Sequence, residues 1–174
     1  MARTVGRSAV QPDVHYTVAD YKTWPDNERW ELINGIAYSM SPAPQSEHQR
    51  QVGELFFQIW KFLDGKVCEP FLSPIDVFLP ILNQESDEET TTVVQPDILV
   101  VCDPQKVVKD GIRGVPDFVV EILSDPTAYK DLNKKRPLRN PWRFRVLDRQ
   151  TQRWKCFGLA MARGAFRSRE RVPP

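Results

Sequence analysis

The sequence predicts an α/β protein, a single domain that combines β-strands with α-helices. Two apolar runs rich in β-branched residues, 98–102 and Phe118–Leu123, each follow a Pro-Asp step and indicate strands buried on both faces. A longer stretch, 46–63, has apolar residues at helical spacing and indicates an amphipathic helix. The 174 residues are enough for one domain to bury a core.

Composition excludes several classes of protein. No run approaches the roughly 20 apolar residues of a membrane span. The first residues lack an apolar signal core, so we expect no export and a cytoplasmic location. The three cysteines are far apart and match neither a zinc site nor a disulfide framework, so we expect them to be reduced. Cys102 then serves as a small apolar core residue.

The charge is unevenly distributed along the chain. Residues 1–135 hold 13 basic and 21 acidic side chains, which gives a net charge of roughly −8. Residues 136–174 hold 11 basic and 2 acidic ones, or roughly +9. The basic segment is either a partly disordered tail or a contact for a phosphate backbone.

The N-terminal part predicts a loose arm over 1–15, a short capped helix from Thr17 and then a hairpin. Asn34-Gly35 suits a two-residue turn between 30–33 and 36–40, because both residues adopt positive φ at little cost. Glu31 alternates with its apolar neighbours and so lies on the opposite strand face. It is either a solvated edge carboxylate or a third acidic group near a site, and the spacing alone favours the former.

The amphipathic helix is expected to begin with Ser46 as its N-cap, with Gln49 reaching back, and to end before Gly65. His48 lies one turn before Val52, on the side that faces the core. Such a histidine is more often structural than a ligand, but its place at a helix start leaves a functional role open. Asp76 either faces a cleft or caps a turn, and we favour the turn.

Two carboxylates are associated with the central strands. Glu121 lies inside the second strand, where an unpaired charge costs several kcal/mol. Asp97 heads the first strand. If the two strands pair, these carboxylates converge at one edge of the sheet and outline a site for a hard cation. A helix expected after Asp125 places Asp131 and Lys135 on one face, either as a surface ion pair or with Lys135 directed toward Glu121.

The ordered set of Glu31, His48, Asp97 and Glu121, followed by Asp131 and Lys135, resembles the Uma-two family of the PD-(D/E)xK, restriction-endonuclease-like superfamily. The resemblance covers roughly residues 15–135 and makes 16–135 the expected domain. It implies a restriction-endonuclease-like core with a central mixed β-sheet flanked by helices. It also implies hydrolysis of double-stranded DNA with Mg²⁺ or Mn²⁺, and superfamily members often act as homodimers.

Site residues follow from this resemblance. Asp97 and Glu121 correspond to the metal-binding acids, and Glu31 to an additional catalytic acid. The usual lysine two residues after the second acid is replaced by Leu123. The resemblance points instead to Lys135 as the catalytic lysine, with Lys134 the weaker candidate. His48 and Asp131 are expected to support the site from around it.

Residues 136–174 depart from the family pattern. Arg136-Pro137 and Asn140-Pro141 interrupt the expected helix, and 144–148 with 153–157 form only a poor hairpin pattern. The abrupt change of charge suggests a shifted reading frame or a diverged end, which resequencing of the gene tests. The alternative to an enzyme is therefore an inactive module of the same fold that binds nucleic acid or protein through its basic end.

Overall fold

The computed structural model describes residues 14–25, 27–40, 45–80 and 86–123, together with the backbone of 144–148 and 153–157. Two β-sheets and two α-helices make up this part of the chain. The helices are α1 (Val18–Tyr21) and α2 (Ser46–Leu63). A single 3-10 turn, η1 (Pro104–Lys106), joins the second sheet to the first.

The first sheet has the strand order β2-β1-β5-β4-β8-β7. Its strands are short: β1 (Trp30–Ile33), β2 (Ile36–Ser39), β4 (Val77–Phe78), β5 (Val93–Val94), β7 (Val107–Val108) and β8 (Gly111–Arg113). The second sheet has the order β11-β10-β9-β6-β3. Its strands are β3 (Glu69–Leu72), β6 (Ile98–Val101), β9 (Phe118–Leu123), β10 (Phe144–Asp148) and β11 (Arg153–Phe157).

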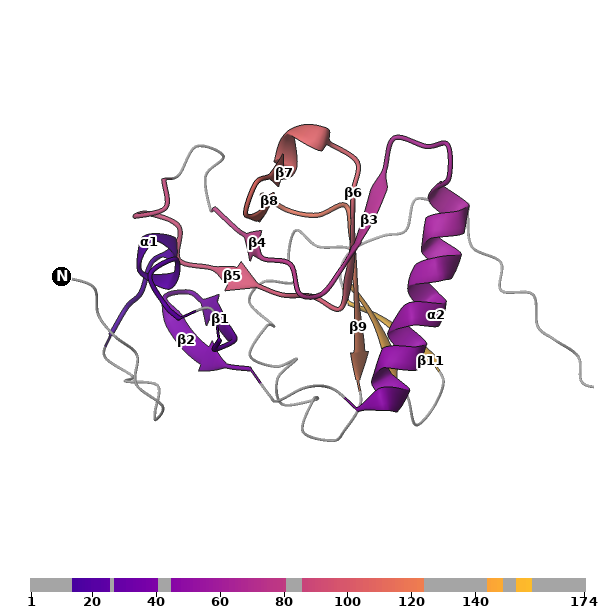
Figure 1. Cartoon of the computed structure of the whole chain (residues 1–174), viewed down its shortest axis with the longest axis horizontal. Helices are drawn as coiled ribbons and strands as arrows, with labels where there is room; N and C mark the ends of the chain where they lie inside the picture. Colours follow the sequence, from indigo (N-terminus) through magenta and orange to yellow (C-terminus); the bar gives the residue numbers. More distant parts are fainter. Residues whose placement is uncertain are drawn as a thin grey trace, which may run out of the picture.

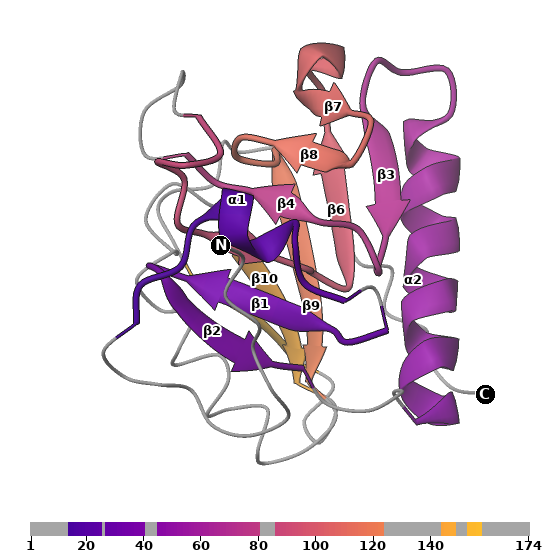
Figure 2. The same cartoon turned by 60° about the vertical axis from the view of Figure 1, so that its left-hand side comes forward.

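The second sheet is the mixed sheet that the sequence predicts. Strand β9 pairs antiparallel with β6 and parallel with β10. Helix α2 lies along one face of this sheet, and the first sheet lies on the other side, with its strands running across those of the second (Figures 1 and 2). The expected α/β class, a mixed sheet with flanking helices, is confirmed. The first sheet is an addition that was not expected.

Three apolar clusters hold these layers together. The cluster between the two sheets joins Ile33 and Val77 of the first sheet to Leu99 and Val119 of the second. The cluster under α2 joins Val52 to residues of β6 and β9, namely Ile98, Val120 and Ile122. The outer face of the first sheet packs against α1 and the chain beside it, through Val18, Trp24, Trp30 and Leu32. Strands β6 and β9 are therefore buried on both faces, as predicted.

The hairpin and helix starts agree with the sequence in part. Asn34 and Gly35 both have positive φ, 49° and 78°, in the turn between β1 and β2. Thr17 caps α1 through a capping box with Asp20, so the predicted capped helix is confirmed, and it spans Val18–Tyr21. The predicted N-cap at Ser46 is wrong. Ser46 is already helical, and Gln45 precedes it without a side-chain cap.

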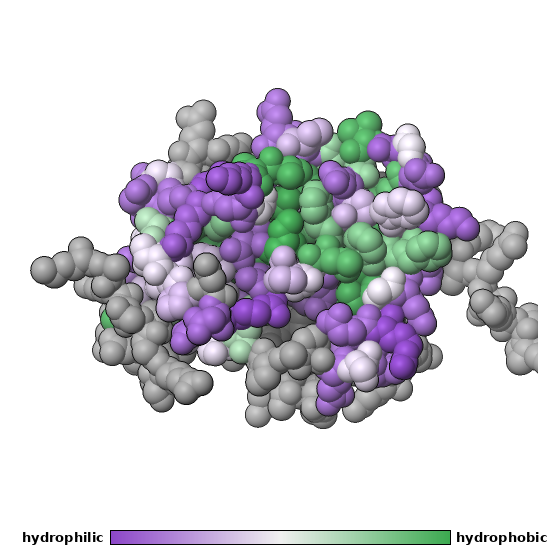
Figure 3. All heavy atoms as spheres, in the orientation of Figure 1, coloured by the Kyte–Doolittle hydropathy of each residue, from purple (hydrophilic) through white to green (hydrophobic). Residues whose placement is uncertain are grey.

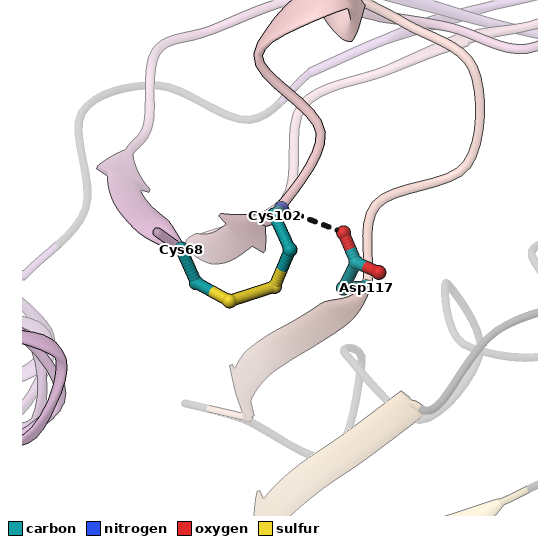
Figure 4. The surroundings of a disulfide bond; sticks show 3 residues. All are labelled: Cys68, Cys102 and Asp117. Carbon is teal, nitrogen blue, oxygen red and sulfur yellow. Dashed lines mark hydrogen bonds between the residues drawn. A yellow bond between two sulfur atoms is a disulfide. The ribbon is translucent and has the colours of Figure 1, made fainter. Parts of the chain in front are cut away.

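The expectation of reduced, unpaired cysteines is also wrong. Cys68 and Cys102 form a disulfide across β3 and β6, with their Cα atoms 3.8 Å apart (Figure 4). The antiparallel register explains the pairing, because Glu69 lies opposite Val101 and the next residues outward are these two cysteines. Cys102 is half-buried and not a core residue, and its N–H donates to the Asp117 carboxylate at 2.8 Å.

Of the chain after residue 123, the structure describes two strands. The two stretches predicted as a hairpin, 144–148 and 153–157, are the antiparallel strands β10 and β11 at the edge of the second sheet. Asp131, Lys135 and the loose arm over 1–13 lie outside the described residues. The division of the chain into an arm, a domain and an aberrant end therefore stays a prediction.

Candidate active site

The site lies where the chain crosses from one sheet to the other. Strand β5 of the first sheet leads through Gln95, Pro96 and Asp97 into β6 of the second sheet (Figure 1). Carboxylates at this crossing remain close to both sheets and can still reach solvent.

Asp97 and Glu121 both adjoin a paired position of β6 and β9. In the antiparallel pairing of β6 with β9, Ile98 lies opposite Val120. Asp97 and Glu121 are the next residues beyond this pair, and continuation of the register would set them opposite each other. The Asp97 Oδ2 atom also accepts a hydrogen bond from the Ile122 N–H at 2.8 Å. The Asp97 carboxylate therefore contacts the strand that carries Glu121, while the pairing of the two acids stays a prediction.

The Asp97 carboxylate is held from two sides. His48, in the first turn of α2, is buried, and its Nε2 lies 3.2 Å from the same Oδ2 atom of Asp97. Among the described residues, no donor contacts Asp97 Oδ1. The side chain of Asp97 is 19% exposed, so this second oxygen can serve a ligand that approaches from solvent.

Glu31 is buried, so the favoured interpretation of a solvated edge carboxylate is wrong. Its side chain is on the same face of β1 as Ile33, which packs between the sheets. It is 8% exposed, and its Oε1 accepts a hydrogen bond from the Gln95 N–H at 3.0 Å. Both faces of β1 are covered by apolar clusters. The alternation of Glu31 with apolar residues was therefore misleading, because neither face of the strand is solvated. Glu31 is therefore bonded to Gln95, which precedes Asp97 by two residues in the chain.

Gln95 is a residue that the sequence did not single out. Its Oε1 accepts from Arg29 Nε at 3.1 Å and Nη2 at 2.7 Å, and its Nε2 donates to Asp76 Oδ1 at 2.7 Å. Tyr21 donates its hydroxyl to the same Asp76 oxygen at 3.0 Å. The only sequence signal was the place of Gln95 directly before the Pro-Asp step.

The same network corrects the interpretation of Asp76, which bonds to distant residues and does not cap a turn. Burial raises the pKa of the Asp76 carboxyl above its ordinary value of 3.8. Burial, together with the charge on Asp76, also raises the pKa of the Tyr21 hydroxyl. Gln95 thus contacts two carboxylates, Glu31 through its backbone N–H and the half-buried Asp76 through its side-chain amide.

The donor set suits a hard cation with few protein ligands. The candidate ligands, Asp97 and Glu121, offer carboxylate oxygens, which Mg²⁺ and Mn²⁺ prefer. No three His, Cys, Asp or Glu side chains in the described part of the chain are grouped closely enough to hold a metal ion by themselves. Mg²⁺ commonly uses one or two carboxylates and completes its shell with water and substrate phosphate, so this set fits it.

A solved structure has a similar fold. A crystal structure described as a putative nuclease belonging to DUF820, from Anabaena variabilis, is similar to this chain with a TM-score of 0.55. The match has 18% sequence identity and covers 82% of this chain and 84% of that one. At this identity the similarity shows the fold alone, an α/β fold that the two proteins share. No protein of curated function matches the chain.

The family follows from the sequence. The family model described as "Uma2: Putative restriction endonuclease" matches residues 18–139, which is more than half of the chain. The chain belongs to this family, and the resemblance found in the sequence is confirmed. The match includes all six predicted site residues, from Glu31 to Lys135.

No helix in the described part of the chain is long and apolar enough to cross a membrane.

Proposed function

We propose that this protein is a metal-dependent endonuclease that hydrolyses phosphodiester bonds of double-stranded DNA, with Mg²⁺ or Mn²⁺ as its cofactor. The observation that supports this most is the contact of the Asp97 carboxylate with the Ile122 N–H, next to Glu121, with the buried Glu31 bonded to the Gln95 N–H two residues before Asp97. Membership of the restriction-endonuclease-like family supports the same activity.

Asp97 and Glu121 would hold the ion. When bound, the ion supplies positive charge beside the phosphate and lowers the pKa of a coordinated water. Asp97 is suited to this role because the Ile122 N–H and His48 fix one of its oxygens and leave the other for a ligand. A carboxylate held in this way needs little reorganisation when a ligand arrives.

The remaining site residues would act on the water and the phosphate. Glu31 is fixed by the Gln95 N–H and would accept a proton or orient a water molecule. Lys135 would stabilise the negative charge that develops on the phosphate. Asp131, four residues before Lys135, would orient it. These two roles follow from the family resemblance, since both residues lie outside the described part of the chain.

The charge of the domain limits its affinity for DNA. Residues 1–135 are net negative, so nonspecific attraction to the phosphate backbone is weak there. Binding then depends on a local site or on a second copy of the chain in a homodimer. Cleavage is expected to be strongest at low salt, where the few basic contacts are least screened.

Nicking of supercoiled plasmid by the full chain tests the proposal. We expect nicking with Mg²⁺ or Mn²⁺, none with EDTA, and none with Asp97→Asn or Glu121→Gln. Glu69→Gln is the matched control, because Glu69 is an exposed carboxylate on the neighbouring strand β3. Metal-independent nicking, or nicking that survives both substitutions, would contradict the assignment.

A second candidate function is a binding module without catalysis, which the basic composition of 136–174 favours. In that case DNA binding persists in Asp97→Asn and Glu121→Gln and disappears when charges in 136–174 are neutralised. We further propose that this segment is a shifted reading frame or a diverged end, since the family model match ends at residue 139. An intact frame on resequencing, with the segment protected from protease, would refute this.

A further inference from the structure

A groove lies beside the acidic site, between β3, β4 and the β7–β8 hairpin. Its volume is about 450 Å³, enough for a nucleotide-sized group. Its apolar lining comes from Phe71, Pro74 and Ile75 and from Val107 and Val108 of β7. Figure 3 shows a band of apolar atoms over this part of the surface, with polar regions on both sides. The groove therefore offers apolar walls that solvent can reach.

One end of the groove is polar and rich in acceptors. Asp76 and Gln95 line it, and the exposed Lys109 and Asp110 lie at the rim. The Oδ1 atom of Asp76 accepts the hydrogen bonds from Tyr21 and Gln95. No donor in the described part of the chain reaches the other oxygen, Oδ2. This oxygen can accept a hydrogen bond from a ligand that enters between the apolar walls.

The groove and the candidate active site share their framework. Gln95 donates its backbone N–H to Glu31 and its side-chain amide to Asp76, so one residue borders both places. The turn that lines the groove also reaches the acidic edge, because the Ser73 N–H donates to the Asp97 carbonyl at 3.1 Å. A polymer bound with a phosphate at Asp97 and Glu121 would have its neighbouring groups at this groove.

We propose that the groove binds an unstacked nucleobase of the substrate strand, and that Asp76 selects bases with an exocyclic amino group. A base has apolar faces that stack on walls such as Phe71 and a polar edge that needs a specific partner. A carboxylate accepts a hydrogen bond from an amino group, as it does from the cytosine N4 amino group, and finds no donor at the same place on thymine. Lys109 at the rim is placed to contact a flanking phosphate. The proposal rests on the proposed nuclease function and adds a base preference to it.

Binding of single deoxynucleosides tests the groove without any cleavage. Saturation-transfer NMR of the metal-free full chain in EDTA would compare deoxycytidine with thymidine. We expect deoxycytidine to bind about tenfold more tightly, the scale of one hydrogen bond to a base edge. Asp76→Asn should abolish this preference, and Val107→Glu, a change at an exposed wall residue, should weaken binding of both nucleosides. Phe57→Ala, at an exposed aromatic of α2 outside the groove, is the matched control.

Three results of the NMR measurement would contradict a base-binding groove. Absence of binding by both nucleosides, equal binding of the two by the wild type, or a loss in Phe57→Ala as large as in Val107→Glu would overturn the proposal. Because the measurement contains no metal and no phosphodiester bond, it can succeed in a protein that does not cleave DNA. Failure of the nuclease assignment and failure of the base site are therefore distinguishable.

Discussion

His48 and Asp97 join helix α2 to the acidic edge of the second sheet, with 3.2 Å between His48 Nε2 and Asp97 Oδ2. A carboxylate oxygen without a proton only accepts hydrogen bonds, and in that case the Nε2–H group of His48 is the donor. The sequence left this histidine open between a structural and a functional role. We propose a positioning role for it, since this contact would fix the orientation of a carboxylate proposed to bind metal.

Removal of the His48 contact should weaken metal binding. We expect His48→Ala to raise the dissociation constant for Mn²⁺ by about tenfold, the usual effect of losing a partner of a metal ligand. His48→Gln should retain most of the affinity, because its amide places a donor near the position of Nε2. Titration calorimetry of both variants measures this, and an unchanged affinity in His48→Ala would exclude the positioning role.

Substitution of Glu31 should separate stability from activity. Glu31→Gln keeps an oxygen for the Gln95 N–H, so the free energy of unfolding should change by less than about 1 kcal/mol. Glu31→Ala leaves that buried N–H without this acceptor and should cost about 1–3 kcal/mol. Plasmid nicking should fall strongly in both variants. Urea unfolding and nicking are measured together, and normal nicking by Glu31→Gln would show that Glu31 is only structural.

The pH dependence of stability should reveal the burial of Asp76. Burial raises the pKa of this carboxyl above 3.8, so the folded protein binds the proton more tightly than the unfolded chain does. Stability is therefore lost as the pH rises from that value through the folded-state pKa. We expect Asp76→Asn to be more stable than the wild type at neutral pH, with the difference vanishing below about pH 3.8.

A matched carboxylate should show the opposite sign. The hydrogen bond from Lys22 lowers the pKa of the Asp110 carboxyl, so Asp110→Asn should be less stable than the wild type at neutral pH. That difference should also disappear at acid pH. Urea unfolding of both variants across this pH range tests the pair. A destabilised Asp76→Asn at neutral pH would show that its hydrogen bonds outweigh the cost of the buried charge.

Local patterns in the sequence predicted what depends on neighbouring residues. The Asn34-Gly35 turn, the Thr17 cap and the two doubly buried strands all follow from short stretches, and these two strands, β6 and β9, pair as the sequence analysis assumed. Beyond its β1–β2 hairpin, the first sheet could not be predicted in this way, because its strands β4, β5 and β7 are only two residues long.

Apart from the N-cap at Ser46, the errors share one physical cause, which is contact between residues far apart in the chain. Glu31 was interpreted as solvated because its burial comes from the second sheet. Gln95 was overlooked because its partners, Arg29 and Asp76, lie 66 and 19 residues away. The disulfide depends on the register of β3 with β6, which no spacing of cysteines reveals.

The disulfide should contribute to stability. It joins residues 34 apart, and a crosslink closing a loop of this size stabilises the folded state by about 2–4 kcal/mol. We expect dithiothreitol to lower the urea midpoint of the wild type and to leave Cys68→Ala unaffected. Cys156→Ala is the control and should keep the full response to the reductant. A wild-type midpoint that is insensitive to reductant, with free thiols detected by alkylation, would show that the pair does not crosslink.

The cluster between the two sheets should determine the stability of the domain. Leu99 of β6 is fully buried there and packs against residues of both sheets. Leu99→Ala should lower the free energy of unfolding by about 2–5 kcal/mol, since it leaves a cavity where the sheets meet. Leu72→Ala is the matched control, because Leu72 lies on the neighbouring strand β3 and is 38% exposed. Its cost should be below about 1 kcal/mol, because surface substitutions usually change stability little. Similar losses in the two variants, measured by urea unfolding, would contradict the packing of the first sheet on the second.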